Sequence, residues 1–283
     1  MDHLLGWLSV VLAGGCLAAP PRIVTPVLNA PRPIAALDTV FLEEMTWMEV
    51  RDALRGGKTT VLVPTGGVEQ NGPYLATGKH DYIVRAAGEA IARRLGDALV
   101  APIVPFVPEG NIDPPSGHMK YPGTLSVSED TYERLLTDLC ASLRVHGFRH
   151  IVLLGDSDGN QRGMQAVANR LTAKWRGEKV RVHFIPQFYD YSEVTRWLEA
   201  QGIHLQSDSV HDDFIVTAQL MAVNPTTVRM HQRLAAGQFR ISGMELNPEA
   251  TVEWGKRILA FRAERTVQAI RQAIITCKQM SHR

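Results

Sequence analysis

Short apolar runs without polar alternation are separated by amphipathic helical patterns through most of this 283-residue sequence. The runs predict strands over residues 59–64, 98–105, 150–155 and 180–186, and the helical patterns predict helices over 81–96, 128–147 and 160–175. Continuous apolar strands are typical of a sheet that is buried on both faces. Their alternation with helices predicts a parallel sheet covered by helices, which is the α/β class.

The helix expected over residues 128–147 has clear boundary signals. Ser128 precedes its first turn as an N-cap, and Gly147 follows its last turn as a stop. Apolar residues recur there at helical spacing and are expected to face the core; they are Leu135, Leu136, Leu139 and Leu143. Cys140 falls on the apolar face, so we expect it to be a core residue.

Charge and cysteine content exclude several classes of protein. Thirty Lys and Arg residues against twenty-nine Asp and Glu residues give a net charge of +1, without a basic block. A nucleic-acid partner is therefore not expected, because such binding relies on clustered Lys and Arg. The cysteines, Cys16, Cys140 and Cys277, lie far apart and lack the paired spacing of zinc and redox motifs. The sequence does not indicate whether Cys140 and Cys277 pair.

The N-terminal residues resemble a targeting segment. The apolar stretch from Leu4 to Leu12 is too short to span a bilayer and has the shape of a signal-peptide core. We interpret residues 1–19 as a signal peptide or a lipoprotein leader with a lipid anchor at Cys16, which predicts a periplasmic or secreted protein. The alternative is a buried or disordered N-terminal segment. The Pro-rich residues 20–40 then form a tether, residues 41–283 form a single domain, and no membrane span is expected.

Polar loops follow three of the expected strands. They carry Glu69, Asn71, Lys79, His80 and Asp81 after the first strand, Glu109, Asn111, Asp113 and His118 after the second, and Asp156, Ser157, Asp158 and Asn160 after the third. Ligands of parallel sheets gather at the carboxyl ends of the strands, because these loops face a common crevice. The sequence therefore predicts a functional site at this edge.

Four segments resemble a known family. The run GGVEQNGPYLATGKHD resembles the metal-binding signature of the creatininase family, and SGHMKYPGTLSV, HGFRHIVLLGDSDGN and VHDDFIVTA resemble further segments of it in the same order. The resemblance covers residues 42–225. It implies a three-layer α/β/α sandwich, a homo-oligomer that is often a hexamer, and a two-metal site whose activated water opens a cyclic amide or cleaves another C–N bond.

Several positions depart from the family pattern. Glu69 stands where the family has a carboxylate ligand and His211 is retained, but Asn71 and Ser157 replace histidine ligands, His80 replaces an aspartate, and Val216 replaces a glutamate. Neutral Asn and Ser are poor substitutes for imidazole. We therefore expect one divalent ion, zinc, manganese or iron, in place of two.

The resemblance also suggests roles for the residues. The expected metal ligands are Glu69, His80 and Asp158; the expected catalytic residues are His211, Asp81 and His118; and the expected substrate-binding residues are Asn71, Tyr74, Lys79, Ser157 and Asn160. The implied function is metal-dependent hydrolysis of an amide or other C–N bond in a small molecule. The implied partners are an amide substrate and further copies of the chain.

Two alternative functions remain open. Residues 155–159, GDSDG, fit the G-x-S-x-G pattern of a serine hydrolase, with Ser157 as nucleophile and Asp190 or Asp208 with His211 or His231 as partners. The changes at Asn71, Ser157 and Val216 suggest instead a ligand-binding or assembly protein whose metal site has decayed.

Overall fold

The computed structural model describes residues 27–207 and 211–280. The helices are α1 Trp47–Arg55, α2 Lys79–Leu95, α3 Glu129–Val145, α4 Gln161–Lys174, α5 Tyr191–Ala200, α6 Phe214–Val223, α7 Met230–Ala235 and α8 Pro248–Met280. The strands are β1 Thr60–Thr65, β2 Ala98–Val100, β3 His150–Gly155, β4 Arg181–Phe184, β5 Arg240–Ile241 and β6 Met244–Glu245. Residues 36–283 form one compact unit, and residues 27–35 belong to a separate one.

The predicted leader, residues 1–19, lies outside the described residues. The tether expected over residues 20–40 is described from residue 27 onward. Its last residue, Val40, is buried, and its carbonyl accepts a hydrogen bond of 2.8 Å from the backbone N–H of Val100 in β2. Within the part of the chain that the structure describes, no helix combines the length and the hydropathy that crossing a membrane requires.

The main sheet is parallel and has the strand order β2-β1-β3-β4. The expected strands all form, and β3 has the predicted bounds. The strand expected over residues 98–105 is shorter than predicted, because β2 ends at Val100. Pro102 and Pro105 follow, and proline has no N–H group to donate to a sheet. The chain returns to the sheet at one further bridge, between Thr65 and Val104.

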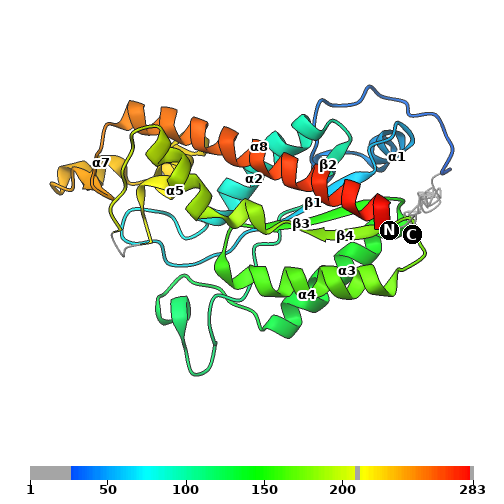
Figure 1. Cartoon of the computed structure of the whole chain (residues 1–283), viewed down its shortest axis with the longest axis horizontal. Helices are drawn as coiled ribbons and strands as arrows, with labels where there is room; N and C mark the ends of the chain where they lie inside the picture. The colour runs from blue at the N-terminus through cyan, green and yellow to red at the C-terminus, as the bar shows by residue number, and fades with distance from the viewer. Residues whose placement is uncertain (1–26, 208–210, 281–283) are drawn as a thin grey trace, which may run out of the picture. The chain divides into compact units, whose positions relative to one another are not determined.

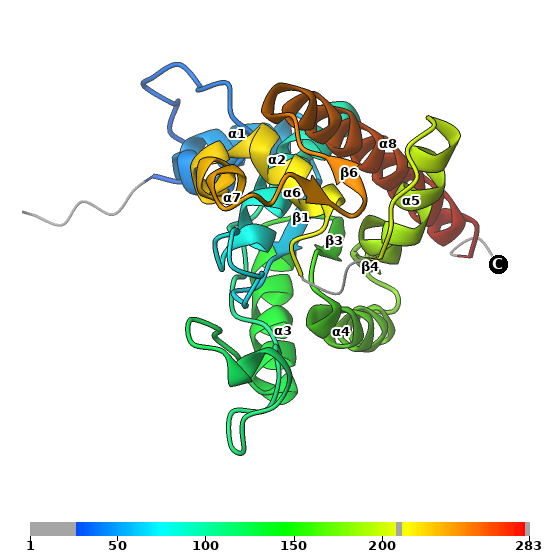
Figure 2. The ribbon, with the colours of Figure 1, turned by 90° about the vertical axis from the view of Figure 1, so that its left-hand side faces the viewer.

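Helices cover both faces of this sheet, as Figures 1 and 2 show. Val61 and Val63 of β1 point to the face that α3 and α4 cover. Leu62 of β1 points to the opposite face, which α2 and α8 cover. Successive side chains of a strand point to opposite faces, so a continuous apolar run supplies both cores. The structure confirms the predicted α/β/α sandwich.

Helix α3 confirms the predicted N-cap and corrects the predicted buried face. The hydroxyl of Ser128 accepts a hydrogen bond from the backbone N–H of Thr131. The fully buried residues are Tyr132, Leu136 and Cys140, whereas Leu135 is 39% exposed. Only one of the four predicted leucines, Leu136, is fully buried, and Tyr132 and Cys140 form the rest of the buried face. Burial raises the pKa of the Cys140 thiol to about 12, as expected for a core residue.

Helices α5, α6 and α7 lie beyond the carboxyl ends of β1 and β3 (Figure 1). Helix α6 is buried over most of its length and packs along α8. The two helices come so close at Gly255 that a Cβ atom there would collide with the carbonyl of Ala218. This packing fixes α6, and with it the segment that carries His211 into the site.

Candidate active site

Glu69 lies at the centre of the site. It is buried in the loop that follows β1. Its Oε1 atom contacts His80 Nε2 at 2.9 Å, His211 Nδ1 at 3.1 Å and Lys79 Nζ at 3.3 Å. Burial by itself raises the pKa of Glu69, but hydrogen bonds from His211 and His80 and the charges of His80 and Lys79 outweigh burial and lower it well below its ordinary value. Glu69 is therefore ionised at neutral pH.

Two histidines from distant segments meet at this carboxylate. His118 belongs to the short 3-10 helix Gly117–Lys120, and its Nε2 atom lies 3.3 Å from Glu69 Oε2. His211 lies shortly before α6, and the two imidazole rings have centroids 4.4 Å apart. One ligand atom from each of Glu69, His118 and His211 lies within 4.8 Å of the others. Burial lowers the pKa of His118 and so favours neutral imidazole, the form that binds metals.

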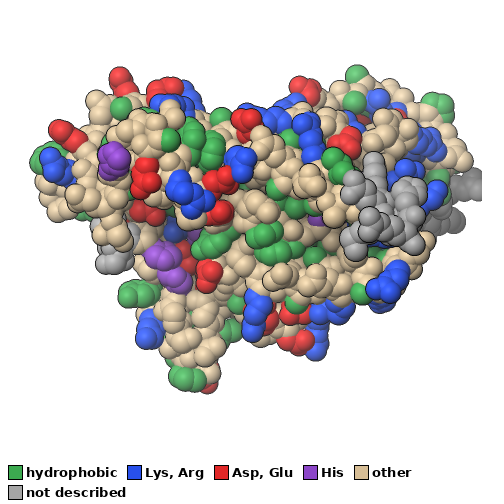
Figure 3. All heavy atoms as spheres, viewed as in Figure 1, with side chains coloured by type: hydrophobic (Ala, Val, Ile, Leu, Met, Phe, Trp, Pro, Cys, Tyr) green, Lys and Arg blue, Asp and Glu red, His purple; other side chains and the backbone are tan. Residues whose placement is uncertain are grey.

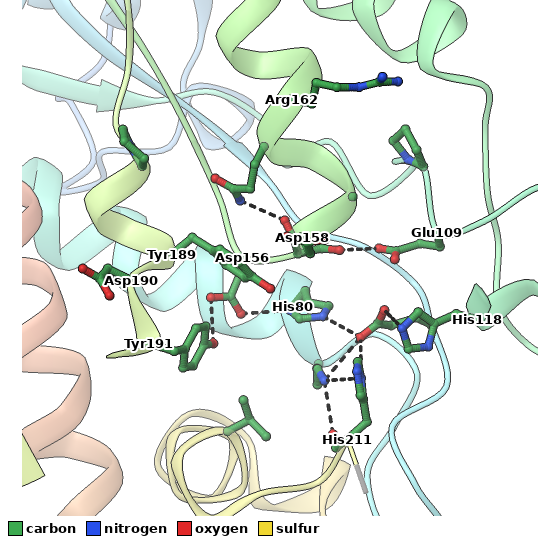
Figure 4. Close-up of a pocket in the computed structure, with 18 of the residues that line it drawn as sticks. His80, Glu109, His118, Asp156, Asp158, Arg162, Tyr189, Asp190, Tyr191 and His211 are labelled. Carbon is green, nitrogen blue, oxygen red and sulfur yellow. Dashed lines mark hydrogen bonds and ion pairs between the residues drawn. The ribbon is translucent and has the colours of Figure 1, made fainter. Parts of the chain in front are cut away.

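This donor set fits one divalent ion. One carboxylate with two imidazoles is the protein part of many catalytic zinc sites, which keep a further position for water. Glu69 Oε1 already has three donors, whereas Oε2 faces His118. Figure 4 shows His80, His118 and His211 around the same part of the site. The metal set that the structure brings together is therefore Glu69, His118 and His211.

His80 is not placed as the expected metal ligand. Its Nδ1 atom lies 2.9 Å from Asp156 Oδ2, and its Nε2 atom lies 2.9 Å from Glu69 Oε1. Burial alone would lower the pKa of His80, but the hydrogen bonds to Asp156 and Glu69 raise it. With a carboxylate at each nitrogen, both nitrogens donate and neither keeps a lone pair for a metal. His80 instead connects two buried carboxylates.

Asp156 links His80 to α8. Its Oδ1 atom accepts hydrogen bonds from Arg262 at 2.5 Å and from the Tyr191 hydroxyl at 2.9 Å. Arg262 also donates to the carbonyl of Phe188 and to Gln219 Oε1, at 2.7 Å each. Burial raises the pKa of Asp156, but Arg262 and His80 outweigh burial and lower it to about 2. The site therefore rests on a chain of buried charges from Glu69 through His80 and Asp156 to Arg262.

The third polar loop does not form a nucleophile elbow. The Ser157 hydroxyl donates to Glu109 Oε1 at 2.8 Å, a carboxyl group where a serine hydrolase would have an imidazole. The backbone of Ser157 is extended, with φ −104° and ψ 148°, whereas an elbow is strained. Packing explains Gly159 of the motif, because a Cβ atom there would collide with the carbonyl of Pro108. The predicted partner Asp208 lies outside the described residues.

Glu109 is a site residue that the sequence did not single out. Its side chain is buried next to Glu69 and Ser157. Burial and then the charge of Glu69 raise its pKa to about 8, so Glu109 holds a proton at neutral pH. Its position in the loop after β2 was the available signal, because the same loop carries His118, an expected catalytic residue.

The other predicted residues occupy different places. Asp158 lines the cavity but is not part of the metal set, and Lys79 and Ser157, the expected substrate-binding residues, also line it. The Asn71 side chain donates to the carbonyls of Glu69, Ala76 and Thr77, and Asn160 donates to those of Thr65 and Gly66, so both amides hold backbone in place.

The Tyr74 ring packs on the Arg233 guanidinium, and Asp81 accepts from the Gly67 backbone N–H at 3.2 Å. Asn71, Tyr74, Asn160 and Asp81 are not among the described residues that line the cavity.

The cluster opens into a cavity of about 1290 Å³. Its walls include Glu69, Glu109, His118 and His211, and it extends to Tyr189 and Tyr191 beside β4. On the face shown in Figure 3, imidazole side chains lie at the surface beside acidic ones. The His211 side chain is 44% exposed and that of His118 is 25% exposed, so both can be reached from solvent. The volume suffices for a small molecule.

Sequence and structure comparisons identify the family. The sequence model of the creatininase family, described as creatinine amidohydrolase, matches residues 43–270. The creatinine amidohydrolase of Pseudomonas putida is 28% identical over 116 residues, which are 41% of this chain and 44% of that protein. The 3-dehydro-scyllo-inosose hydrolase of Thermotoga maritima is 27% identical over 196 residues, which are 69% of this chain and 59% of that protein. The aligned segments thus span about half the length of these relatives.

A solved structure described as "Creatininase Mn" superposes with a TM-score of 0.66 at 21% identity, covering 83% of this chain and 99% of that one. The fold is therefore that of a creatininase. Because the family model matches most of the sequence, the chain belongs to the creatininase family.

Proposed function

We propose that this protein is a metal-dependent hydrolase of an amide or other C–N bond in a small molecule. The observation that carries the proposal is the cluster of Glu69, His118 and His211 at the wall of a large cavity. Family membership and the creatinine amidohydrolase and hydrolase relatives support the reaction class. Loss of hydrolysis on chelation, with recovery on adding zinc or manganese, is the expected result of the first test. Hydrolysis that persists after the metal has been removed would contradict it.

The metal ion, when bound, would polarise the substrate carbonyl and lower the pKa of a bound water toward neutrality. Glu69, His118 and His211 would hold it. Ser157 lines the cavity beside this cluster and would orient the substrate. The cavity at Tyr189 and Tyr191 would then receive the rest of the molecule.

Glu109 takes the proton-transfer role in this proposal. The sequence named His211, Asp81 and His118 as the expected catalytic residues, but His118 and His211 belong to the metal set and Asp81 accepts from the Gly67 backbone N–H. The Glu109 carboxyl lines the cavity and accepts from Ser157 at 2.8 Å. From there it would deliver a proton to the leaving nitrogen.

Glu109→Gln should therefore lower kcat by roughly 100- to 10,000-fold, the usual contribution of a positioned acid or base. Metal content and thermal stability should stay near those of the wild type, because the amide keeps the size and the hydrogen bond of the carboxyl. Glu199→Gln, at an exposed position of α5, is the matched control and should leave kcat unchanged. Retention of full activity by Glu109→Gln would remove Glu109 from the mechanism.

We also propose that the chain forms a homo-oligomer. The segment between β2 and α3 projects from the helical layer in Figure 2 and carries large apolar side chains that are about half exposed; they are Phe106, Ile112, Tyr121 and Leu125. Apolar side chains grouped in this way are typical of protein interfaces. Light scattering during gel filtration should give a multiple of the 31.3 kDa chain mass or, after removal of a leader, of the shorter chain. A monomeric mass would contradict the proposal.

Export to the periplasm or the medium is likewise proposed, from the apolar stretch Leu4 to Leu12. Intact mass spectrometry of the protein from its native cells tests this proposal. Loss of the first residues, with or without a lipid on Cys16, is expected, and an intact cytoplasmic chain would overturn it.

A further inference from the structure

We propose that Lys79 is a built-in cation of the metal centre, which limits the site to one divalent ion and weakens the binding of that ion. This inference rests on the proposed function, because it concerns the same Glu69, His118 and His211 cluster. It differs from the role that the sequence suggested for Lys79, which was contact with the substrate.

The Lys79 ammonium lies among groups that could bind a metal. Its Nζ atom lies 3.3 Å from Glu69 Oε1, 3.2 Å from the His211 carbonyl and 3.4 Å from His211 Nδ1. A carboxylate, a carbonyl and an imidazole are also the usual ligands of divalent ions. An ammonium group has three N–H donors and no acceptor. His211 Nδ1 donates to the ionised Glu69 and so cannot also accept from Lys79; the ammonium donates to Glu69 Oε1 and to the His211 carbonyl and lies against the imidazole nitrogen.

The position of Lys79 is fixed by the fold. Lys79 and His80 are the first two residues of α2, and both reach Glu69 Oε1 from the start of that helix. The side chain of Lys79 is 4% exposed, so water does not solvate its charge freely. In Figure 4 dashed lines run from His80 and from His211 toward a shared carboxylate, and the contact distances identify it as Glu69. The cation therefore belongs to the site as built and is not a surface charge.

The two oxygens of Glu69 consequently have different surroundings. Oε1 faces the donors of Lys79, His80 and His211, whereas Oε2 faces His118 at 3.3 Å. A divalent ion on the Oε2 side would leave Lys79 in place. A second ion on the Oε1 side would have to displace the buried Lys79 ammonium, which lies 3.3 Å from that oxygen. Two positive charges held within a few ångströms of each other repel strongly when water does not screen them. Lys79 thus occupies the Oε1 side of the carboxylate and repels a metal ion bound on the Oε2 side.

Metal titration of the full-length protein tests this inference. Native mass spectrometry gives the number of zinc ions per chain, and competition with a chromophoric chelator gives the dissociation constant. The wild type should bind one zinc ion per chain. Lys79→Met and Lys79→Gln should bind it at least about tenfold more tightly, because each removes a positive charge beside the ligands. The Gln variant keeps a hydrogen-bond donor and the Met variant does not, so the pair separates the effect of charge from that of the lost hydrogen bonds.

Lys174→Met, at an exposed position of α4, is the matched control and should bind zinc as the wild type does. Two zinc ions in the wild-type site would overturn the inference, as would unchanged affinity in a folded Lys79→Gln variant. The absence of zinc binding from every variant would instead contradict the proposed metal-dependent function, and the inference would fail with it. One ion bound with equal affinity by all variants would overturn the role of Lys79 alone.

Discussion

Replacing Glu69 with Gln should weaken metal binding at least about 100-fold, since changes even to residues behind the metal ligands cost 10- to 100-fold. The Gln side chain has one oxygen and one NH₂ group. Three donors surround the Oε1 position, namely those of Lys79, His80 and His211, so the oxygen of Gln should turn toward them. The NH₂ group then faces His118 and has no lone pair for a metal.

The same change should lower hydrolysis to below about one-thousandth of the wild-type rate, because the activated water depends on the bound metal. Glu109→Gln is the matched comparison within the same cavity. It should lose turnover and keep its metal, whereas Glu69→Gln should lose both. Atomic emission spectrometry after incubation with excess zinc, followed by desalting, separates the two variants. A Glu69→Gln protein that retains one zinc ion per chain would exclude Glu69 as a ligand.

Arg262→Met should destabilise the protein by about 3–5 kcal/mol, the cost of breaking a buried ion pair by removing one partner. Arg262 and Asp156 are both almost completely buried. Methionine fills much of the space of Arg262 but cannot hydrogen-bond Asp156, Gln219 or the Phe188 carbonyl. Asp156 would keep only His80 and Tyr191 as hydrogen-bond partners among those described here. Urea unfolding curves give the change in free energy of unfolding.

Arg265→Met provides the control on the same helix. Arg265 is 45% exposed and pairs with Glu193, so its loss should cost less than about 1 kcal/mol. The double variant Asp156→Asn with Arg262→Met should be less destabilised than the sum of the single changes, because residues in one network are coupled. Equal destabilisation by Arg262→Met and Arg265→Met would show that the buried pair does not support the site.

The layers of the fold could be predicted because their signals are local. Val61, Leu62 and Val63 each fill a core on one or the other face of the sheet, so the strand reads as a continuous apolar run. Ser128 caps α3 through its own hydroxyl, and a sequence pattern detects that contact. The second strand was predicted too long, because two prolines interrupt an apolar composition that otherwise favours a strand.

The partners of the site residues were less predictable. Glu69 could be located from the sequence because it stands where the family has a carboxylate ligand. The structure places it in the cluster with His118 and His211. His80 was expected to be a ligand because it stands where the family resemblance has an aspartate ligand, but its role depends on Asp156, 76 residues away. Arg262 carries no local signal at all, since its charge acts only once α8 lies against the end of β3. Contacts of this kind depend on the tertiary fold and not on spacing in the sequence.

Crystals of the protein soaked in zinc would locate the ion and its ligands through the anomalous X-ray signal at the zinc absorption edge. We expect one peak per chain, about 2.0–2.2 Å from a carboxylate oxygen of Glu69 and from ring nitrogens of His118 and His211. A peak between His80 and Asp158, or no peak at the cluster, would contradict this expectation.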